Sequence, residues 1–295
     1  MGQAAKPFVK WAGGKSRLLE EIETRLPRDL VRRDDVLYVE PFVGGGAVLF
    51  WILQKYPNIR RAVINDINPN LITAYNAVKH MPERLISELR RLQSEYSTLG
   101  DDARKEFFME RRRQFNGDGI ADLDRAALFI FLNKTCFNGL YRVNSHGHFN
   151  VPHGRYVNPR ICDAETVMAD AEVLQRVEIM CGDFSGSERF AAGNTIYYFD
   201  PPYKPLSKTS SFTAYSVDAF DDDDHLRLRE FCSEVARRGS RFILSNSDLK
   251  AVDTTNDFFD DLYRPFNITR VLASRFVNAD ASGRGLLPEL LVSNI

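Results

Sequence analysis

The stretch "VLYVEPFVGGGAVLFWILQKY", residues 36–56, decides the fold of this chain. Its first part, "VLYVEPF", is rich in β-branched and aromatic residues and predicts a buried strand over 36–42. The three glycines at 44–46 end that strand, and the apolar run after them predicts a helix. "RAVINDIN", residues 61–68, predicts a second strand. This order of strand, glycine turn, helix and strand begins a parallel α/β sheet.

The same alternation returns later in the chain. Strands are predicted at 177–183, 195–203, 241–248 and 289–295, and an amphipathic helix at 223–239 that Gly239 ends. Between the two halves, residues 75–165 contain charged helical patterns, a buried helix at 124–135 and an irregular stretch. We therefore predict an α/β fold, a Rossmann-like doubly wound sheet formed by 1–74 and 166–295, with an inserted and mainly helical lobe at 75–165.

Composition narrows the class of protein. The chain has 295 residues, is 44% hydrophobic and has a net charge of −1, so it can bury a large core but shows no global charge signal for nucleic acid. Its four cysteines are widely spaced, which favours neither a zinc site nor disulfides and indicates reduced thiols in a cytoplasm. No apolar run is long enough to span a membrane. We expect a monomer.

Two glycine-rich stretches are candidate nucleotide sites. "KWAGGKSR", residues 10–17, resembles the end of a P-loop, but the glycine that such a loop needs is replaced by Val9. "FVGGGAV" is not a dinucleotide motif either, because Leu49 stands where the third glycine belongs. Asp66 ends the second strand, where a carboxylate can accept hydrogen bonds from both hydroxyls of a ribose. A tight turn with a helix-capping aspartate remains the alternative.

Four motifs in a fixed order carry a family resemblance. "FVKWAGGK", "EPFVGGGAV", "NDIN" and "DPPY" together resemble S-adenosylmethionine-dependent DNA adenine-N6 methyltransferases of the Dam type, from Pro7 to about Asn294. The resemblance implies the methyltransferase form of the doubly wound sheet, with S-adenosylmethionine as cofactor. It implies double-stranded DNA as substrate, modified alone or beside a cognate restriction endonuclease. It is loose over 275–288, so no site residue is assigned there.

The resemblance also implies a cofactor site. Trp11 would lie near the methionine end of the cofactor, Lys15 near its carboxylate or a neighbouring acidic group, and Asp66 at the ribose. Asp183 and Phe184 would lie beside the adenine ring. The complete set implied for the cofactor is Trp11, Lys15, Glu40, Phe42, Gly44, Gly46, Asp66, Asp183, Phe184 and Asp200.

The segment Asp200-Pro201-Pro202-Tyr203 is the predicted catalytic site. Adenine N6 is a poor nucleophile because its lone pair is delocalised into the ring. The Asp200 carboxylate and the Pro201 carbonyl can accept hydrogen bonds from the two N–H groups, and Tyr203 can stack on the base. The target base must leave the duplex stack to reach this site. A proline-rich turn after a strand is the structural alternative.

The segment from Ala126 to Cys162 contains no Asp or Glu, which suits contact with phosphates and base edges. A neutral loop packed on the core is the alternative. The resemblance makes this the target-recognition segment and implies GATC as the target, chiefly through Arg155. Phe137 could wedge between bases. The residues it implies for DNA contact are Lys10, Asn138, Leu140, Arg142, Pro152, Arg155 and Tyr156.

Three charged or histidine-rich features receive other interpretations. His146, His148 and His153 lack a nearby carboxylate or thiol partner, so we expect phosphate contact or solvent exposure and no metal. The run Asp221–Asp224 is interpreted as the solvated start of a helix. Arg111–Arg113 is either a phosphate contact or a solvated helix face.

Two other functions stay open at this point. An RNA or protein amino methyltransferase would share the cofactor half, and related enzymes of that kind have Asn at the first position of the catalytic motif. A DNA-binding module with a degenerate nucleotide fold is the non-enzymatic alternative. The presence together of Lys15, Asp66, Asp200 and Tyr203 argues against it.

Overall fold

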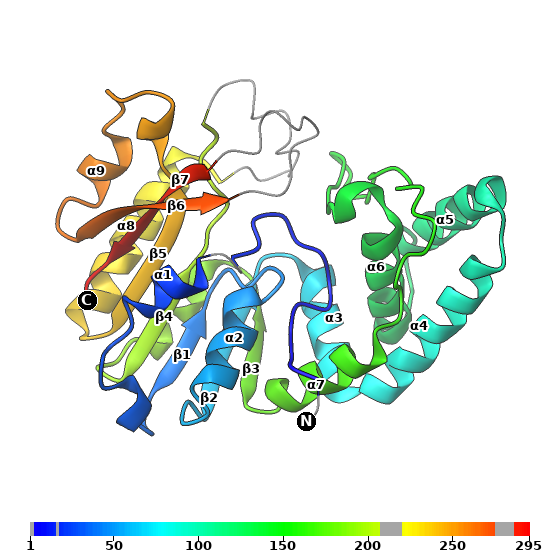
Figure 1. Ribbon diagram of the computed structural model, residues 1–295, viewed down its shortest axis with the longest axis horizontal. Helices are drawn as coiled ribbons and strands as arrows, with labels where there is room; N and C mark the ends of the chain where they lie inside the picture. The colour runs from blue at the N-terminus through cyan, green and yellow to red at the C-terminus, as the bar shows by residue number, and fades with distance from the viewer. Residues whose placement is uncertain (1–2, 16–17, 207–219, 275–285) are drawn as a thin grey trace.

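The computed structural model describes residues 3–15, 18–206, 220–274 and 286–295. Most of segment 275–288 therefore lies outside the described residues. Seven strands form one sheet in the order β3-β2-β1-β4-β5-β7-β6 (Figure 1). The strands are β1 Leu37–Glu40, β2 Arg61–Asp66, β3 Val177–Cys181, β4 Thr195–Phe199, β5 Arg241–Ser247, β6 Asn267–Ser274 and β7 Leu286–Ser293. The neighbouring pairs β3–β2, β2–β1, β1–β4 and β4–β5 are parallel. Strand β7 runs antiparallel to both of its neighbours, β5 and β6.

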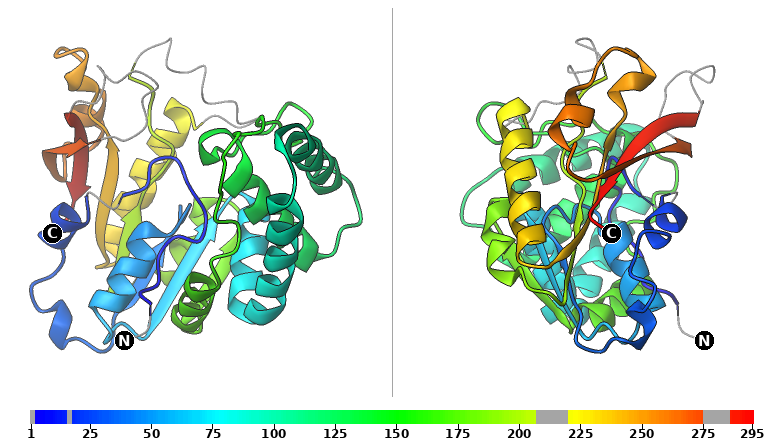
Figure 2. Two further views of the ribbon diagram at one scale, coloured as in Figure 1. Left: turned by 45° about the vertical axis from the view of Figure 1, so that its right-hand side comes forward. Right: turned by 90° about the vertical axis from the view of Figure 1, so that its left-hand side faces the viewer.

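Alternating side chains bury both faces of this sheet. In β4, Ile196 and Tyr198 face one apolar cluster while Tyr197 and Phe199 face the other. The first cluster contains α2 Ala47–Lys55, α3 Pro69–His80 and α7 Ala164–Leu174; the second contains α8 Asp222–Arg237 and α9 Phe258–Leu262. Helices α2 and α8 accordingly lie on opposite sides of the sheet (Figure 2). Because both faces of the parallel strands are buried, their sequences are continuous apolar runs and do not alternate between apolar and polar residues.

A second group of helices extends from one side of the sheet. It contains α4 Pro82–Ser97, α5 Asp101–Phe115 and α6 Asp122–Thr135, followed by the short turn η2 Phe137–Gly139. Helix α6 is buried from Ala126 to Asn133 and packs on α3, α4 and α5 (Figure 1). It thereby connects the helical group to the sheet. The remaining short helices are α1 Leu19–Glu23, η1 Leu30–Arg32, η3 Phe184–Phe190 and η5 Leu249–Ala251.

The predicted strands and helices are confirmed, and β6, α7 and the short helices α1 and α9 are additions. Strand β6 was not predicted, because it is the edge strand of the sheet, is interrupted by polar residues and leaves Leu272 66% exposed. Helix α7 was not predicted either. Its N-cap Asp163, which accepts a hydrogen bond from the Thr166 backbone N–H, stands at the predicted boundary of the inserted lobe.

The acidic run before α8 is a helix start, as predicted. The Asp221 side chain accepts from the Asp224 backbone N–H, and the Asp224 side chain accepts from the Asp221 backbone N–H. Gly239 follows the last turn with φ 86°, so the prediction that it ends this helix is also confirmed. Among the described residues, no helix has the length and apolar character that a membrane span requires.

Candidate active site

The predicted site residues gather at the carboxyl edge of the parallel strands. After β1 the chain adds strands toward one edge of the sheet, through β2 and β3. After β4 it adds strands toward the other edge, beginning with β5. The topological switch point therefore lies between the neighbouring strands β1 and β4. Open α/β sheets bind ligands at such a point. Glu40 ends β1, Asp66 ends β2 and Asp200 directly follows β4.

Trp11 lies over the glycine turn after β1. A Cβ atom added to Gly44 would lie 2.8 Å from Trp11 Cδ1, so the indole occupies that space. The indole of Trp11 also stacks on Tyr141, with ring centroids 5.9 Å apart. Trp11 therefore joins the glycine turn to the segment that follows α6.

Gly46 holds the turn in a shape that other residues resist. Its φ is 75°, and a Cβ atom there would lie 2.5 Å from the Tyr75 hydroxyl. That hydroxyl is fixed, because it donates a hydrogen bond of 3.0 Å to the Gly44 carbonyl. Both the left-handed backbone and the close approach require glycine.

We expect Gly46→Ala to lower the free energy of unfolding by about 2 kcal/mol or more, from backbone strain and the displaced Tyr75. Chemical denaturation measures this loss. The control is Gly193→Ala, since a Cβ atom at Gly193 meets nothing within 4 Å and its φ is ordinary. Equal stability of the two variants would contradict the role of the turn.

Asp66 stabilises the same turn from the next strand. Its Oδ2 accepts from the Gly44 N–H at 3.0 Å and its Oδ1 from the Asn68 N–H at 2.9 Å. Burial raises the pKa of Asp66, and these backbone hydrogen bonds oppose the shift. Asn68, not Asp66, caps α3, by accepting from the Asn70 and Leu71 N–H groups. The capping alternative therefore does not account for Asp66.

Lys15 and Asp200 form an ion pair between residues that are far apart in the sequence. Lys15 Nζ lies 2.8 Å from Asp200 Oδ1; the lysine side chain is 6% exposed and the aspartate side chain 21%. The ammonium also donates to the Gly13 carbonyl and lies 4.5 Å from the centroid of the Tyr203 ring. Burial raises the pKa of Asp200, and Lys15 opposes that shift. Asp200 is thus held in place but still open on one side.

Glu40 is a second buried carboxyl group beside this pair. It is 2% exposed and accepts a 2.8 Å hydrogen bond from the Tyr38 hydroxyl. Burial raises the pKa of Glu40 well above its usual range; the hydrogen bond from Tyr38 opposes this, the charge of Asp200 adds to it, and Lys15 opposes it. The charge of Lys15 therefore favours the ionised form of both carboxyl groups, against the effect of burial.

Strands β5 and β7 hold the Asp200–Lys204 segment. Ser245 Oγ donates to Asp200 Oδ1 at 3.0 Å, and Asn246 Oδ1 accepts from the Lys204 N–H at 3.2 Å. Ser247 Oγ donates to the Lys204 carbonyl at 2.7 Å. Glu289, which is 6% exposed, accepts from the Tyr203 hydroxyl at 2.7 Å.

Sequence reasoning missed these supporting residues. Their signals in the sequence are the polar side chains at the end of the apolar strand in "RFILSNSD" and the single acidic residue before the apolar run in "PELLVSN".

Phe42 and Phe184 lie together at the ends of β1 and β3, with ring centroids 5.2 Å apart. Asp183 caps the following helix through the Ser185 N–H and pairs with Arg227 at 3.0 Å. Burial raises the pKa of Asp183, but the hydrogen bonds from Ser185 and Arg227 lower it by more, so the net shift is downward.

The acid-free segment begins in the buried part of α6 and continues into the loops after η2, where Tyr141 contacts Trp11. Arg142 Nε donates to Asn150 Oδ1 at 2.7 Å, which fixes its direction. Asn138 and Arg155 have positive φ angles of 56° and 54°, and both are exposed. Leu140 is partly buried and Pro152 is exposed.

The interpretations of His153 and of Arg111 and Arg112 need correction. His153 is neither solvent-exposed nor free for phosphate, because its Nε2 lies 2.7 Å from the Tyr96 hydroxyl and burial lowers its pKa. Arg112 donates to the Val151 carbonyl at 3.3 Å, and the Arg111 guanidinium lies 4.7 Å from the centroid of the Phe107 ring. These two arginines therefore pack against their own helical group and do not form a solvated face. In the described part of the chain, no group of three His, Cys, Asp or Glu residues could hold a metal ion.

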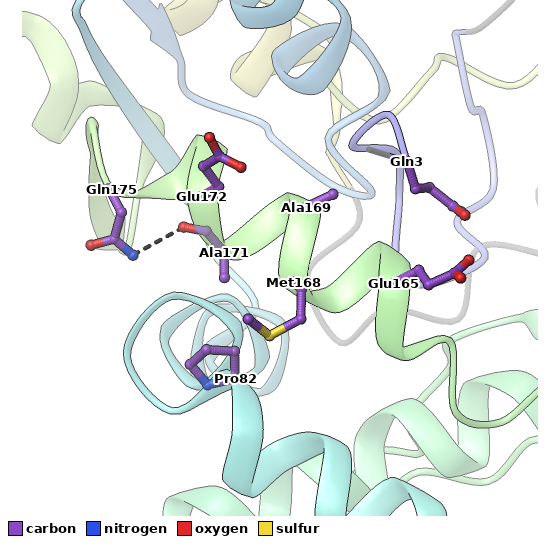
Figure 3. Close-up of a pocket in the computed structure, with 8 residues that line it drawn as sticks. All are labelled: Gln3, Pro82, Glu165, Met168, Ala169, Ala171, Glu172 and Gln175. Carbon is purple, nitrogen blue, oxygen red and sulfur yellow. Dashed lines mark hydrogen bonds between the residues drawn. The ribbon is translucent and has the colours of Figure 1, made fainter. Parts of the chain in front are cut away.

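One groove lies away from the catalytic edge. It runs between α7 and the start of α4 (Figure 3). Its lining residues are Gln3, Pro82, Glu165, Met168, Ala169, Ala171, Glu172 and Gln175. None of them belongs to the predicted site.

Comparison with known proteins gives a consistent result. The family described as D12 class N6 adenine-specific DNA methyltransferase matches residues 11–275. The chain is 47% identical over 293 residues to the type II methyltransferase M.MjaIII of Methanocaldococcus jannaschii, covering 98% of this chain and 99% of that relative. It is 36% identical over 289 residues to the DNA adenine methylase of Vibrio cholerae, covering 97% and 95%.

Proposed function

We propose, from the premise that this chain belongs to the D12 class of N6 adenine-specific DNA methyltransferases, that S-adenosylmethionine is its methyl donor and that the carboxyl edge of the sheet holds both reactants. The reaction is methylation of adenine N6 in DNA. This membership decides against the RNA, protein and non-enzymatic alternatives.

The described residues fit this cofactor. The Asp66 carboxylate accepts one backbone hydrogen bond on each oxygen, so lone pairs remain for two ribose hydroxyls. Phe42 and Phe184 offer an apolar, aromatic wall for an adenine. Ile67, which sequence reasoning did not select, is 65% exposed directly after Asp66 and suits the same role. Trp11 lies against the glycine turn and Lys15 beside Asp200, where the methionine end would extend.

The catalytic assignment follows from the surroundings of Asp200. The sulfonium of S-adenosylmethionine supplies an electrophilic methyl group. The open side of the Asp200 carboxylate and the Pro201 carbonyl accept hydrogen bonds from adenine N6, which draws the lone pair out of the ring. As N6 becomes positive, the negative charge of Asp200 stabilises it more strongly than in the ground state. Tyr203, fixed by Glu289, provides the stacking surface.

A single observation carries this function: Asp200 is fixed by both Lys15 and Ser245 at the switch point next to the glycine turn. The test supplies labelled S-adenosylmethionine with unmethylated duplex DNA, tRNA and a protein pool. We expect label in DNA alone, recovered as N6-methyladenine. Titration calorimetry with S-adenosylhomocysteine tests the cofactor separately.

We also propose that 75–165 is the DNA-recognition domain and that 1–74 with 166–295 is the catalytic domain. Lys10, Asn138, Leu140, Arg142, Pro152, Arg155 and Tyr156 would contact duplex DNA, with GATC as the expected target. The exposure of Asn138, Pro152 and Arg155 supports this. We propose a monomer that acts in the cytoplasm. The relative named a type II methyltransferase supports a cognate endonuclease as partner. Sequencing of DNA methylated by the protein identifies the target.

Arg142→Ala should relax the choice of one base pair. Asn150 already orders this guanidinium, and a bidentate contact to guanine discriminates by about 1–3 kcal/mol. Measuring kcat/KM on duplexes with single base changes tests this. The control, Arg113→Ala, removes an exposed arginine of α5 and should affect all duplexes equally. A uniform loss for Arg142→Ala would instead assign it to phosphate.

A further inference from the structure

Asn133 joins two segments of the protein that have different proposed tasks. It lies near the end of α6 and is 3% exposed. Its Oδ1 accepts from the Lys10 N–H at 2.7 Å, and its Nδ2 donates to the Lys10 carbonyl at 2.8 Å and to the Gly139 carbonyl at 2.9 Å. Both donors and the acceptor of this amide are therefore used. We call residues 3–15 the strap and η2, Phe137–Gly139, the recognition turn.

The strap and the recognition turn touch each other directly at this point. Gly139 has φ 63°, and a Cβ atom there would lie 2.5 Å from Lys10 Cβ. Lys10 Nζ lies 4.4 Å from the centroid of the Tyr156 ring, and the Tyr156 hydroxyl accepts from the Asn138 N–H at 3.1 Å. This fit leaves no space for one segment to shift without the other.

The strap leads from this contact to the proposed cofactor site. Trp11 follows Lys10, stacks on Tyr141 and lies over Gly44. Further along, Lys15 pairs with Asp200. The recognition turn leads in the other direction to the residues proposed to contact DNA. Asn133 is thus a buried polar side chain that is hydrogen-bonded both to the strap, which leads to the proposed cofactor site, and to the recognition turn, which leads to the proposed DNA-contact residues.

We propose that Asn133 is a positioning residue that couples DNA binding to binding of the methyl donor. The inference rests on the proposed function. An apolar side chain of the same size would remove this hydrogen-bond partner from three backbone groups, of which the Gly139 carbonyl is buried. The strap and the recognition turn would then no longer be held in a fixed position relative to each other. Each ligand would then order only its own segment, and the mutual gain in affinity would be lost.

Gln54 provides a matched control. Its Oε1 accepts from the Ala5 N–H and its Nε2 donates to the Ala5 carbonyl, both at 2.8 Å. This is the same type of amide clamp on the same strap, but it comes from α2 and makes no hydrogen bond to the recognition turn. A purely structural role of the clamps predicts equal effects of Gln54→Met and Asn133→Leu.

The experiment measures the Kd of S-adenosylhomocysteine for the full chain, with and without a duplex that the enzyme methylates. The ratio of the two values is the coupling factor. We expect about fivefold or more for the wild type and for Gln54→Met, and a value near one for Asn133→Leu. A wild-type factor of one, an unchanged Asn133→Leu factor, or an equal loss in Gln54→Met would each overturn the inference. No binding of S-adenosylhomocysteine to the wild type would overturn the proposed cofactor instead.

A second variant tests the same contact if Asn133→Leu fails to fold. Gly139→Ala places a methyl group against Lys10 Cβ and should also abolish the coupling. Its control is Gly147→Ala, because Gly147 has a similar positive φ of 76° but nothing lies within 4 Å of a Cβ atom there. Normal coupling in Gly139→Ala, or a loss in Gly147→Ala as large as in Gly139→Ala, would contradict the role of this contact.

Discussion

Asp200→Ala is expected to lower kcat for DNA methylation by about 10³-fold or more, while changing the affinity for S-adenosylhomocysteine far less. Loss of one preorganised hydrogen-bonding partner of a transition state typically costs about 10²–10³-fold. Asp200 supplies such a partner and also a negative charge that opposes the positive charge developing on N6. Single-turnover rates on duplex DNA, together with calorimetry, separate the chemical step from binding.

Two further variants sharpen this prediction. Asp200→Asn keeps an oxygen acceptor but removes the charge, so its rate should fall between those of the wild type and Asp200→Ala. Asp222→Ala removes a carboxylate that is 60% exposed in the first turn of α8, where it pairs with Lys204. That control should keep wild-type kcat. Near-normal turnover in Asp200→Ala would remove the catalytic assignment.

Lys15→Met should reduce activity at neutral pH and shift the acidic limb of the pH–rate profile to higher pH. Burial raises the pKa of Asp200 and Lys15 opposes that shift, so removing the ammonium raises the pKa of Asp200 further. Catalysis needs the ionised carboxylate. The variant therefore loses activity at a pH where the wild type is still active, and recovers part of it as the pH rises. Glu40, which also faces Lys15, loses the same neutralising charge.

The measurement is kcat/KM across the pH range in which both proteins stay folded. Lys204→Met is the control, because Lys204 neighbours the catalytic segment but pairs with the exposed Asp222. Its acidic limb should coincide with that of the wild type. If Lys15→Met lowers the rate by the same factor at every pH, then Lys15 acts in cofactor binding alone and does not set the ionisation of Asp200.

Local sequence patterns were sufficient for most of the framework. The strand at 36–42, the glycine turn and the acidic start of α8 depend on side chains close together in the chain, so periodicity, glycine and capping signals predict them. The order of the motifs was sufficient to indicate the family. Strand β6 and helix α7 were not predicted, because neither carries a strong local signal in the sequence. Strand β6 is an exposed edge strand, and α7 follows an irregular loop.

The sequence by itself thus determined the fold class and the family resemblance, and it selected Asp66 and Asp200 as candidate site residues. Only the tertiary structure decided that Lys15 neutralises Asp200, that Ser245 and Glu289 support the catalytic segment, and that His153 is packed against Tyr96. These contacts join residues from distant parts of the chain. Their geometry arises from the packing of strands and helices, and no short-range pattern records which distant side chains that packing brings together.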